Sequence, residues 1–267
     1  MSIRPAATRS DLLGSWIVLI AMLFGVGILL GFIGAGGGGV LIGLLSGVFG
    51  LEIDKAIGTA LAAMCVVTVF GAVSHYREGH VATRIGLIVG ITGILGAAAG
   101  AELGQHVPNR VLELGAGLTL WFLAMLVWYR TRMMARAHQT EVDREPLTRR
   151  TEFARGVTLG GTGGVAAGFL GVGMAPYLQL GFLSALRLSL VQTIGTTMLT
   201  LVFISGSAAT ILARHGDVSG KHLFAAVIGL SSGSYLGAKF TARAPYRLLR
   251  GTVVAVPIVA GAMVLFL

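Results

Sequence analysis

Charged side chains are scarce in this sequence and are missing from long parts of it. They make up 12% of the 267 residues, and the mean hydropathy is +0.85, whereas a soluble domain has about 25% charged residues. A helix that spans a membrane needs about 20 apolar residues. The pattern therefore excludes an ordinary soluble domain and predicts an all-α, polytopic bundle of membrane helices. No Asp, Glu, Lys, Arg or His occurs in residues 12–51, 56–74, 85–101, 114–129, 156–186, 188–213, 223–238 or 251–267.

Patterns of metal ligands and disulfide partners are also missing. Cys65 is the only cysteine, which excludes an intrachain disulfide and a cysteine-rich metal site. No His-x-x-x-His or Asp-rich motif is present. We therefore predict no metal and no cofactor. An intramembrane enzyme is disfavoured, because it needs a nucleophile with a base or clustered metal ligands. The six histidines lie near loops or in the charged linker, at His75, His80, His106, His138, His215 and His222.

No acidic or basic side chain stands in the middle of any predicted membrane helix. Proton relays inside membranes generally use such residues, so the sequence disfavours a cation pump. An anion held by backbone dipoles and hydroxyl groups fits this composition better.

The net charge of +9 does not indicate nucleic-acid binding, because many of the arginines cluster in one segment together with acidic residues. Seven arginines lie between residues 130 and 155, interleaved with four acidic residues. Cytoplasmic loops of membrane proteins carry such an excess of Lys and Arg. Residues 131–155 are therefore predicted to form a charged cytoplasmic linker that contacts anionic lipid headgroups and no nucleic acid.

The two halves of the sequence match each other when one is shifted by 137 positions. Duplicated membrane domains are found in many secondary transporters, which bind substrate between the repeats. We predict membrane repeats at 12–130 and 156–267. Because residues 31–36 belong to the first repeat, we expect that the apolar N-terminal run is not cleaved as a signal peptide.

Each repeat is predicted to contain five helices, with a glycine-rich break after the first. The 40 uncharged residues from 12 to 51 would form one helix about 60 Å long, twice the ~30 Å thickness of the hydrocarbon core. The chain must therefore turn at the glycines, and such backbone is tolerated at membrane depth only inside protein or beside a watery cavity. The predicted helices are 12–33, 40–50, 55–76, 84–104 and 110–130, then 156–170, 177–187, 192–213, 221–241 and 247–267, with breaks at 34–39 and 171–176.

The sequence leaves the relative orientation of the repeats open. If the short second helices are re-entrant, the repeats are parallel and 13 of the 20 Lys and Arg lie inside. If the short helices cross the membrane, the repeats are inverted and 14 of the 20 lie inside. The positive-inside rule does not separate these counts. We favour inversion by analogy with transporters that have five helices per repeat and a break at the midplane.

The two breaks are the first candidate substrate site. Each is followed directly by an apolar helix, whose free N–H groups and positive dipole end face the break and can hold an anion without a charged side chain. The alternative is close helix packing through small residues, the role assigned to the glycine stripe in 84–104. Recurrence of the break in both repeats favours binding. The predicted substrate-binding residues are Gly34, Gly36, Gly37, Gly38, Gly171, Gly173, Met174, Ala175 and Pro176.

Two Gly-Thr pairs form a second candidate site, through Thr59 and Thr196, with Gln192 nearby. Their hydroxyl and amide groups can donate to an oxyanion in a medium of low dielectric constant. The alternative is a threonine hydroxyl bonded to its own i−4 carbonyl. At the helix ends, His75, Arg77 and Arg214 are candidates for gating or coupling, against the alternative of a solvated interfacial loop.

Three motifs recur in the same order in both halves of the chain. They are Gly34-Ala35-Gly36-Gly37-Gly38, Ala56-Ile57-Gly58-Thr59 and Arg77-Glu78-Gly79-His80-Val81, then Gly171-Val172-Gly173-Met174-Ala175-Pro176, Ile194-Gly195-Thr196 and Arg214-His215-Gly216-Asp217-Val218. In their order and duplication they resemble the TauE/SafE sulfite exporter family, over almost all of the chain outside the linker. The sequence departs from the family where Met174 and Ala175 replace glycines and where Gly43 replaces a frequent proline.

The resemblance implies a secondary transporter of the cell membrane that exports or imports small sulfur-containing anions, namely sulfite, thiosulfate, sulfonates or sulfoacetate-like compounds. Proton coupling is supposed for the family, although nothing in this sequence shows it. The sequence does not decide whether the protein forms a homo-oligomer. A passive anion channel is the alternative, and an intramembrane enzyme is a more distant one. A channel passes a current set by the anion gradient alone, whereas a transporter saturates and responds to a second ion.

Overall fold

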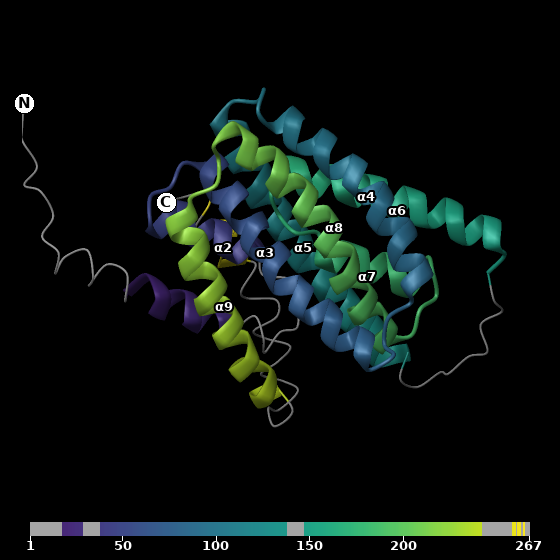
Figure 1. Ribbon diagram of the computed structural model, residues 1–267. Coiled ribbons are helices and arrows are strands. Elements are labelled where there is room, and N and C mark those ends of the chain that lie inside the picture. The colour runs from purple at the N-terminus through teal and green to yellow at the C-terminus, as the bar shows by residue number, and fades with distance from the viewer. Residues whose placement is uncertain are drawn as a thin grey trace, which may run out of the picture.

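The computed structural model describes residues 18–28, 38–137 and 147–241, together with positions 258, 259, 261, 262 and 264. Within these residues all regular structure is helical and no strand is assigned, as the sequence predicts. The helices, shown in Figure 1, are Val18–Ile28, α2 Gly38–Gly43, the π-helical turn η1 Leu44–Val48, α3 Ile53–Arg77, α4 Thr83–Gly104, α5 Asn109–Ala137, α6 Arg149–Leu170, α7 Ala175–Ser184, α8 Leu190–His215 and α9 Gly220–Thr241.

Three predicted helices agree with the observed ones to within two residues at each end, namely α3, α4 and α8, and α9 agrees at its start. α5 and α6 extend further into the linker than predicted, to Ala137 and from Arg149. Arg, Met and Ala favour helix, so the change from apolar to charged sequence did not mark the helix ends. The ends of the predicted helix 12–33, the break positions Gly34, Gly36 and Gly37, and most of 247–267 lie outside the described residues.

Local sequence explains where the helices of the second half begin and end. α6 ends at Gly171, whose φ of 70° is a left-handed conformation that glycine adopts without strain. Pro176 stands in the first turn of α7, where its missing N–H costs no helical bond. α8 begins with a capping box between Ser189 and Gln192 and ends at Gly216, with φ 86°.

The centre of the bundle is an antiparallel pair formed by α3 and α8. Gly58, near the start of α3, lies against Leu212, near the end of α8. Further along, the Cys65 thiol donates to the Val202 carbonyl at 3.7 Å, and Gly71 lies against Met198. Because residue numbers rise along α3 as they fall along α8, the two helices run in opposite directions.

Two further helix pairs are parallel and pack through glycines. Gly96 on α4 lies directly against the backbone at Gly161 and Val165 on α6. Gly233 on α9 meets the backbone at Phe24 and Ile28 in the same way. These helices approach closely because the glycine at each contact has no side chain to hold the neighbouring backbone away. The predicted packing role of the glycine stripe in 84–104 is confirmed.

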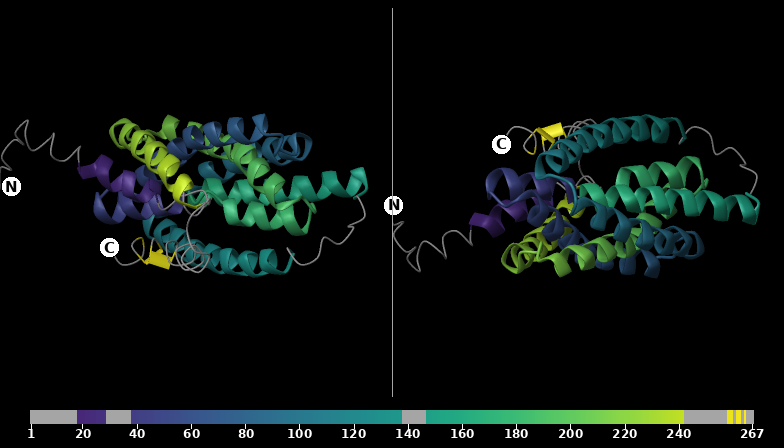
Figure 2. Two further views of the ribbon diagram at one scale, coloured as in Figure 1. Left: turned by 90° about the horizontal axis from the view of Figure 1, so that it is seen from below. Right: turned by 90° about the horizontal axis from the view of Figure 1, so that it is seen from above.

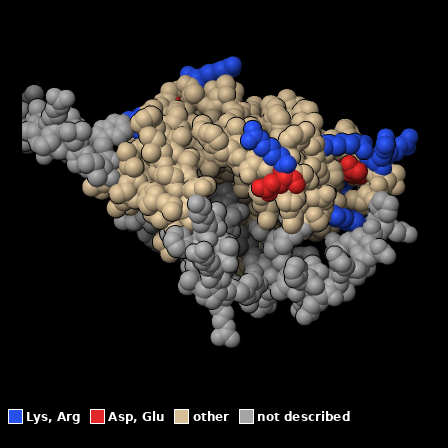
Figure 3. Space-filling model, turned by 60° about the horizontal axis from the view of Figure 1, so that its bottom comes forward, with Lys and Arg blue, Asp and Glu red and all other residues tan. Residues whose placement is uncertain are grey.

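The helices form an elongated bundle with α5 as an outer layer. α5 lies along one side of the bundle, against α6 and α7, in both views of Figure 2. Three helices are long and apolar enough to cross a membrane, namely Ile53–Arg77, Thr83–Gly104 and Val191–His215. On the face in Figure 3, most of the described surface carries no charge, and the visible charged side chains lie in small groups. These features fit a multi-pass membrane protein.

Candidate functional site

The two predicted breaks meet inside the bundle. A Cβ placed on Gly38, the first residue of α2, would lie 3.3 Å from the backbone nitrogen of Gly173, just before α7. It would also lie 3.1 Å from the sulfur of Met64, which is the twelfth of the 25 residues of α3. The start of α2 and the segment before α7 are therefore neighbours at mid-depth in the bundle.

α2 and α7 run from this meeting point to opposite ends of the bundle. α2 and η1 lead to the start of α3, and α7 leads to the start of α8. Since α3 and α8 are antiparallel, their starts lie at opposite ends. The first described residue of α2 and the N-terminal end of α7 therefore face the same central point. The first N–H groups of a helix have no partner within it and carry its positive dipole end, so this arrangement suits an anion.

The second break is entirely buried. Residues 171 to 176 are all buried, and Gly171 packs its backbone against Ile57 of α3. The Ala175 N–H donates to the Gly173 carbonyl, and Pro176 has no N–H. The predicted residues Gly38, Gly171, Gly173, Met174, Ala175 and Pro176 are thus brought together around the start of α7, and their contact with substrate stays a prediction.

Met64 is the residue at this point that sequence reasoning missed. Its side chain is 5% exposed, and its thioether contacts Gly38 and Gly173, one from each break. The residue 137 positions later, which the predicted repeat makes equivalent, is Leu201. A methionine in an apolar run carries no signal by itself, because its importance comes only from the two glycines that approach it.

The Gly-Thr pairs each lie against a turn that belongs to the other half of the chain. The Thr59 hydroxyl oxygen accepts from the Ser219 N–H at 2.9 Å, and the Thr196 hydroxyl oxygen accepts from the Ala82 N–H at 3.0 Å. Both threonines are fully buried. The two bonds are equivalent under the shift of 137 positions, and each hydroxyl keeps its proton to donate.

The two threonines lie at opposite ends of the α3–α8 pair. Gly58 lies beside Leu212 and Gly195 lies beside His75, so Thr59 and Thr196 are separated by about 25 Å along the helices. One small anion does not reach both hydroxyls. The i−4 bonding considered for them is found instead one turn later, where Thr200 donates to the Thr196 carbonyl at 2.9 Å.

The remaining predicted residues lie at helix ends. Gln192 is exposed and takes part in the α8 capping box. Arg77 and Arg214 are exposed in the last turns of α3 and α8. His75 is half-buried and lies 3.8 Å from Glu78. The structure therefore gives Gln192 a capping role, and the gating roles of the other three stay predictions.

Sequence reasoning also missed a set of buried polar side chains on α7 and α8. Gln179 is 0% exposed on α7, and Thr193 is 0% exposed at the start of α8, where its hydroxyl has no hydrogen-bond partner. A buried polar atom without a protein partner is uncommon and points to water or ligand. The signal in the sequence that could have identified these side chains was a polar residue inside a run without charged residues. The buried hydroxyls of α8, besides that of the predicted Thr196, belong to Thr193, Thr197, Thr200 and Ser205.

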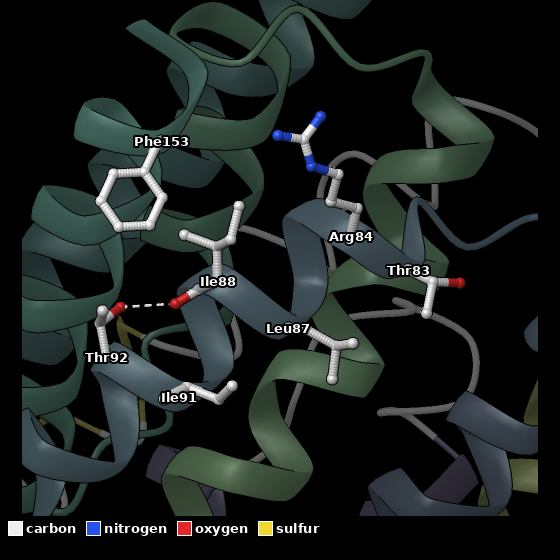
Figure 4. Close-up of a pocket in the computed structure, with 7 residues that line it drawn as sticks. All are labelled: Thr83, Arg84, Leu87, Ile88, Ile91, Thr92 and Phe153. Carbon is white, nitrogen blue, oxygen red and sulfur yellow. Dashed lines mark hydrogen bonds between the residues drawn. The ribbon is translucent and has the colours of Figure 1, made fainter. Parts of the chain in front are cut away.

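A groove of about 770 Å³ on the outside of α4 and α6 is a poor anion site. Figure 4 shows its lining, with Leu87, Ile91 and Phe153 presenting apolar surface and Arg84 at one end. None of its lining residues belongs to a break or to a Gly-Thr pair. Its exposed apolar side chains suit lipid chains better than a hydrated anion.

The comparisons with known proteins find a matching family model and relatives named as membrane transporters. A family model described as Sulfite exporter TauE/SafE matches residues 19–264. The chain is 37% identical over 250 residues to the Probable membrane transporter protein YdhB of Bacillus subtilis (strain 168), covering 93% of this chain and 100% of that protein. It is 29% identical over 221 residues to a Probable membrane transporter protein of Xylella fastidiosa (strain Temecula1 / ATCC 700964), covering 82% of each. No solved structure matches the chain.

Proposed function

This chain belongs to the sulfite exporter TauE/SafE family, and we propose that it is a secondary transporter that carries a small sulfur-containing oxyanion, such as sulfite or a sulfonate, across the cell membrane. The family and the names of the relatives support membrane transport. The observation that supports an anion as substrate is the approach of Gly38, the first described residue of α2, to Gly173, just before the N-terminus of α7.

The chemistry of this meeting point suits an oxyanion. A helix N-terminus stabilises a nearby negative charge by about 0.3–1 kcal/mol, and by up to ~2 kcal/mol where it is partly buried. Each charge-assisted hydrogen bond adds about 1.5–3 kcal/mol. A helix N-terminus at this point thus offsets part of the cost of removing an anion from water. The uncharged runs 12–51 and 156–186, which contain the two predicted breaks, supply no lysine or arginine to this point.

The packing supports inverted repeats. α3 and α8 are equivalent under the shift of 137 positions and lie antiparallel, as a two-fold axis perpendicular to the helices requires. Equivalent residues also meet each other, since the Trp121 indole donates to the Ile258 carbonyl at 3.2 Å, as Cys65 does to Val202. In inverted transporters the substrate sits near the midplane between such repeats, which is where Gly38 and Gly173 meet.

The distribution of charge supports a cytoplasmic linker. At the end of the bundle that carries the linker, two helices end, α3 and α5, and three begin, α4, α6 and α8. Four Lys and Arg of the described residues lie at the opposite end, namely Lys55, Arg110, Arg214 and Lys221. Nine arginines lie at the linker end. By the positive-inside rule, the proposal assigns that richer end to the cytoplasmic side. The nine are Arg77, Arg84, Arg130, Arg132, Arg136, Arg149, Arg150, Arg155 and Arg187.

Thr59 and Thr196 fit this proposal as residues of two opposite entry routes rather than of one site. Thr59 precedes Met64 by five residues, about 7 Å along α3. It lies towards the end of the bundle where α9 begins, opposite the linker. Thr196 lies towards the linker end. Each hydroxyl proton is available to an anion that moves from one surface to the breaks.

A transport assay tests the function directly. The purified protein is reconstituted into liposomes, and uptake of sulfite, thiosulfate, sulfoacetate and taurine is measured against chloride and sulfate, with and without a pH gradient. We expect saturable uptake of at least one sulfur oxyanion that responds to a second ion. Uptake that follows the anion gradient alone, without saturation, identifies a channel. No uptake of any of the four compounds contradicts the proposal.

A further inference from the structure

Two histidines and a glutamate gather at the turn between α3 and α4. Glu78 Oε2 lies 3.1 Å from His80 Nδ1 and 3.8 Å from His75 Nδ1. One ligand atom from each residue lies within 4.8 Å of the other two. Across the described part of the chain, no other group of three His, Cys, Asp or Glu side chains meets this condition.

The backbone holds these three residues in place. Gly79 adopts a φ of 74°, which turns the chain back so that the His80 N–H donates to the His75 carbonyl at 2.9 Å. The turn is fixed to α8 as well, because the His80 carbonyl lies against Gly195 and the Ala82 N–H donates to Thr196. A rigid frame of this kind favours a metal site, because the ligands lose little freedom on binding.

The second half of the chain contains the same turn without these ligands. Gly216 has a φ of 86°, and the Asp217 N–H donates to the Leu212 carbonyl at 2.9 Å. Leu212, His215 and Asp217 stand where the first half has His75, Glu78 and His80. The fold therefore forms this turn without two histidines and a glutamate. Formation of the turn does not explain why the first half has these three residues.

The two polar residues of the second turn have partners elsewhere. His215 lies 3.3 Å from Glu102, and Asp217 accepts from Gln105 at 2.7 Å. In the first turn, the Nδ1 atom of His75 is shielded from solvent and has no hydrogen-bond partner. Buried nitrogen atoms without a partner are rare in proteins and often face a missing water or ion.

We propose that His75, Glu78 and His80 bind a divalent transition metal ion such as Zn²⁺. Zn²⁺ binds histidine nitrogen and carboxylate oxygen at about 2.0–2.2 Å, and a tetrahedral site then separates its ligand atoms by about 3.4 Å. The observed separations of 3.1 and 3.8 Å lie on either side of that value. Two imidazoles with one carboxylate suit zinc, copper, nickel or iron rather than magnesium or calcium. Water completes the coordination.

A metal at this position joins the end of α3 to the turn that packs on the start of α8. The site lies at the linker end of the bundle, apart from Gly38, Gly173 and Met64. Binding there stabilises the contact between α3 and α8 by favouring the folded turn over its open forms. We therefore expect metal binding to raise the melting temperature of the protein, whether or not it alters transport.

Metal titration of the full-length protein tests this inference. The protein is purified in detergent through an affinity tag without histidine, stripped with a chelator, and titrated with Co²⁺, whose visible spectrum reports imidazole and carboxylate ligands, and with Zn²⁺ by calorimetry. We expect one equivalent to bind and to raise the melting temperature. His80→Ala and Glu78→Gln should each weaken binding at least tenfold, whereas His106→Ala, at an exposed histidine outside the group, should not.

The melting temperature of Glu78→Gln without metal separates loss of a metal ligand from loss of the fold. Glu78→Gln keeps the size of the exposed side chain, so its melting temperature without metal should equal that of the wild type. Equal weakening by His80→Ala and His106→Ala would show scattered surface binding and overturn the site. Absence of stoichiometric binding to a wild-type protein that melts cooperatively would overturn it as well.

Discussion

Thr59 and Thr196 show how a motif can serve packing and remain available to a substrate. Each hydroxyl oxygen accepts a hydrogen bond from a buried turn, and the neighbouring glycine lets the carbonyl of Asp217 or His80 approach. The sequence predicted that these residues matter but not their partners, because the partners come from the other half of the chain and the repeat does not show which segments pack together.

Replacing the two threonines by valine measures their structural role. Thr59→Val and Thr196→Val should each lower the free energy of unfolding by about 1–3 kcal/mol, because a buried N–H loses its acceptor. The two losses should add in the double variant, since the sites lie far apart. Thr210→Val, at an exposed threonine that donates to its own i−4 carbonyl, is the control. Unchanged stability with weakened substrate binding would contradict the packing role.

Met64 should influence which anions the breaks accept. Met64→Ala removes the side chain that fills the space between Gly38 and Gly173, so larger sulfonates should gain relative to sulfite in a competition assay. Leu201→Ala, at the equivalent buried position of α8, should cost similar stability, about 2–5 kcal/mol, without this change. The same ratio of sulfonate to sulfite uptake in both variants would make Met64 a packing residue only.

At the scale of helices, the glycine stripe between α4 and α6 is open to a direct test. A methyl group on Gly100 would strike the backbone at Val165 and Phe169, which side-chain motion does not relieve, whereas one on Gly161 would meet nothing within 4 Å. Gly100→Ala should destabilise the protein by about 1–3 kcal/mol. Gly161→Ala should be neutral or stabilising by up to about 1 kcal/mol. Equal melting temperatures of the two variants would contradict the packing account.

Helix positions were predictable where charge and glycine mark the ends of an apolar run. α3 and α8 begin after Glu52 and Ser189 and end before glycine turns, so the sequence placed them closely. The ends of α5 and α6 were not predictable in this way, because an arginine-rich helix continues past the membrane surface. The meeting of Gly38 and Gly173 required the antiparallel packing of α3 and α8, which composition does not encode.

At the scale of the whole molecule, inverted repeats place equivalent turns on opposite sides of the membrane. Glu78 and His215 are exposed and 137 positions apart, and they form a matched pair for cysteine labelling in a Cys65→Ser background. In intact cells, an impermeant maleimide should label His215→Cys, and should label Glu78→Cys only after permeabilisation. Labelling of both residues from the same side would indicate parallel repeats and contradict this topology.

The central claim is that an anion binds where the two breaks meet, and sulfite affinity of a single variant tests it most directly. Gly38→Ala places a methyl group 3.3 Å from the Gly173 nitrogen, so it blocks the approach to that N–H without adding charge. Loss of one charge-assisted hydrogen bond, about 1.5–3 kcal/mol, should weaken sulfite binding by tenfold or more, while Gly161→Ala leaves it unchanged. Wild-type sulfite affinity in a well-folded Gly38→Ala protein would contradict the account.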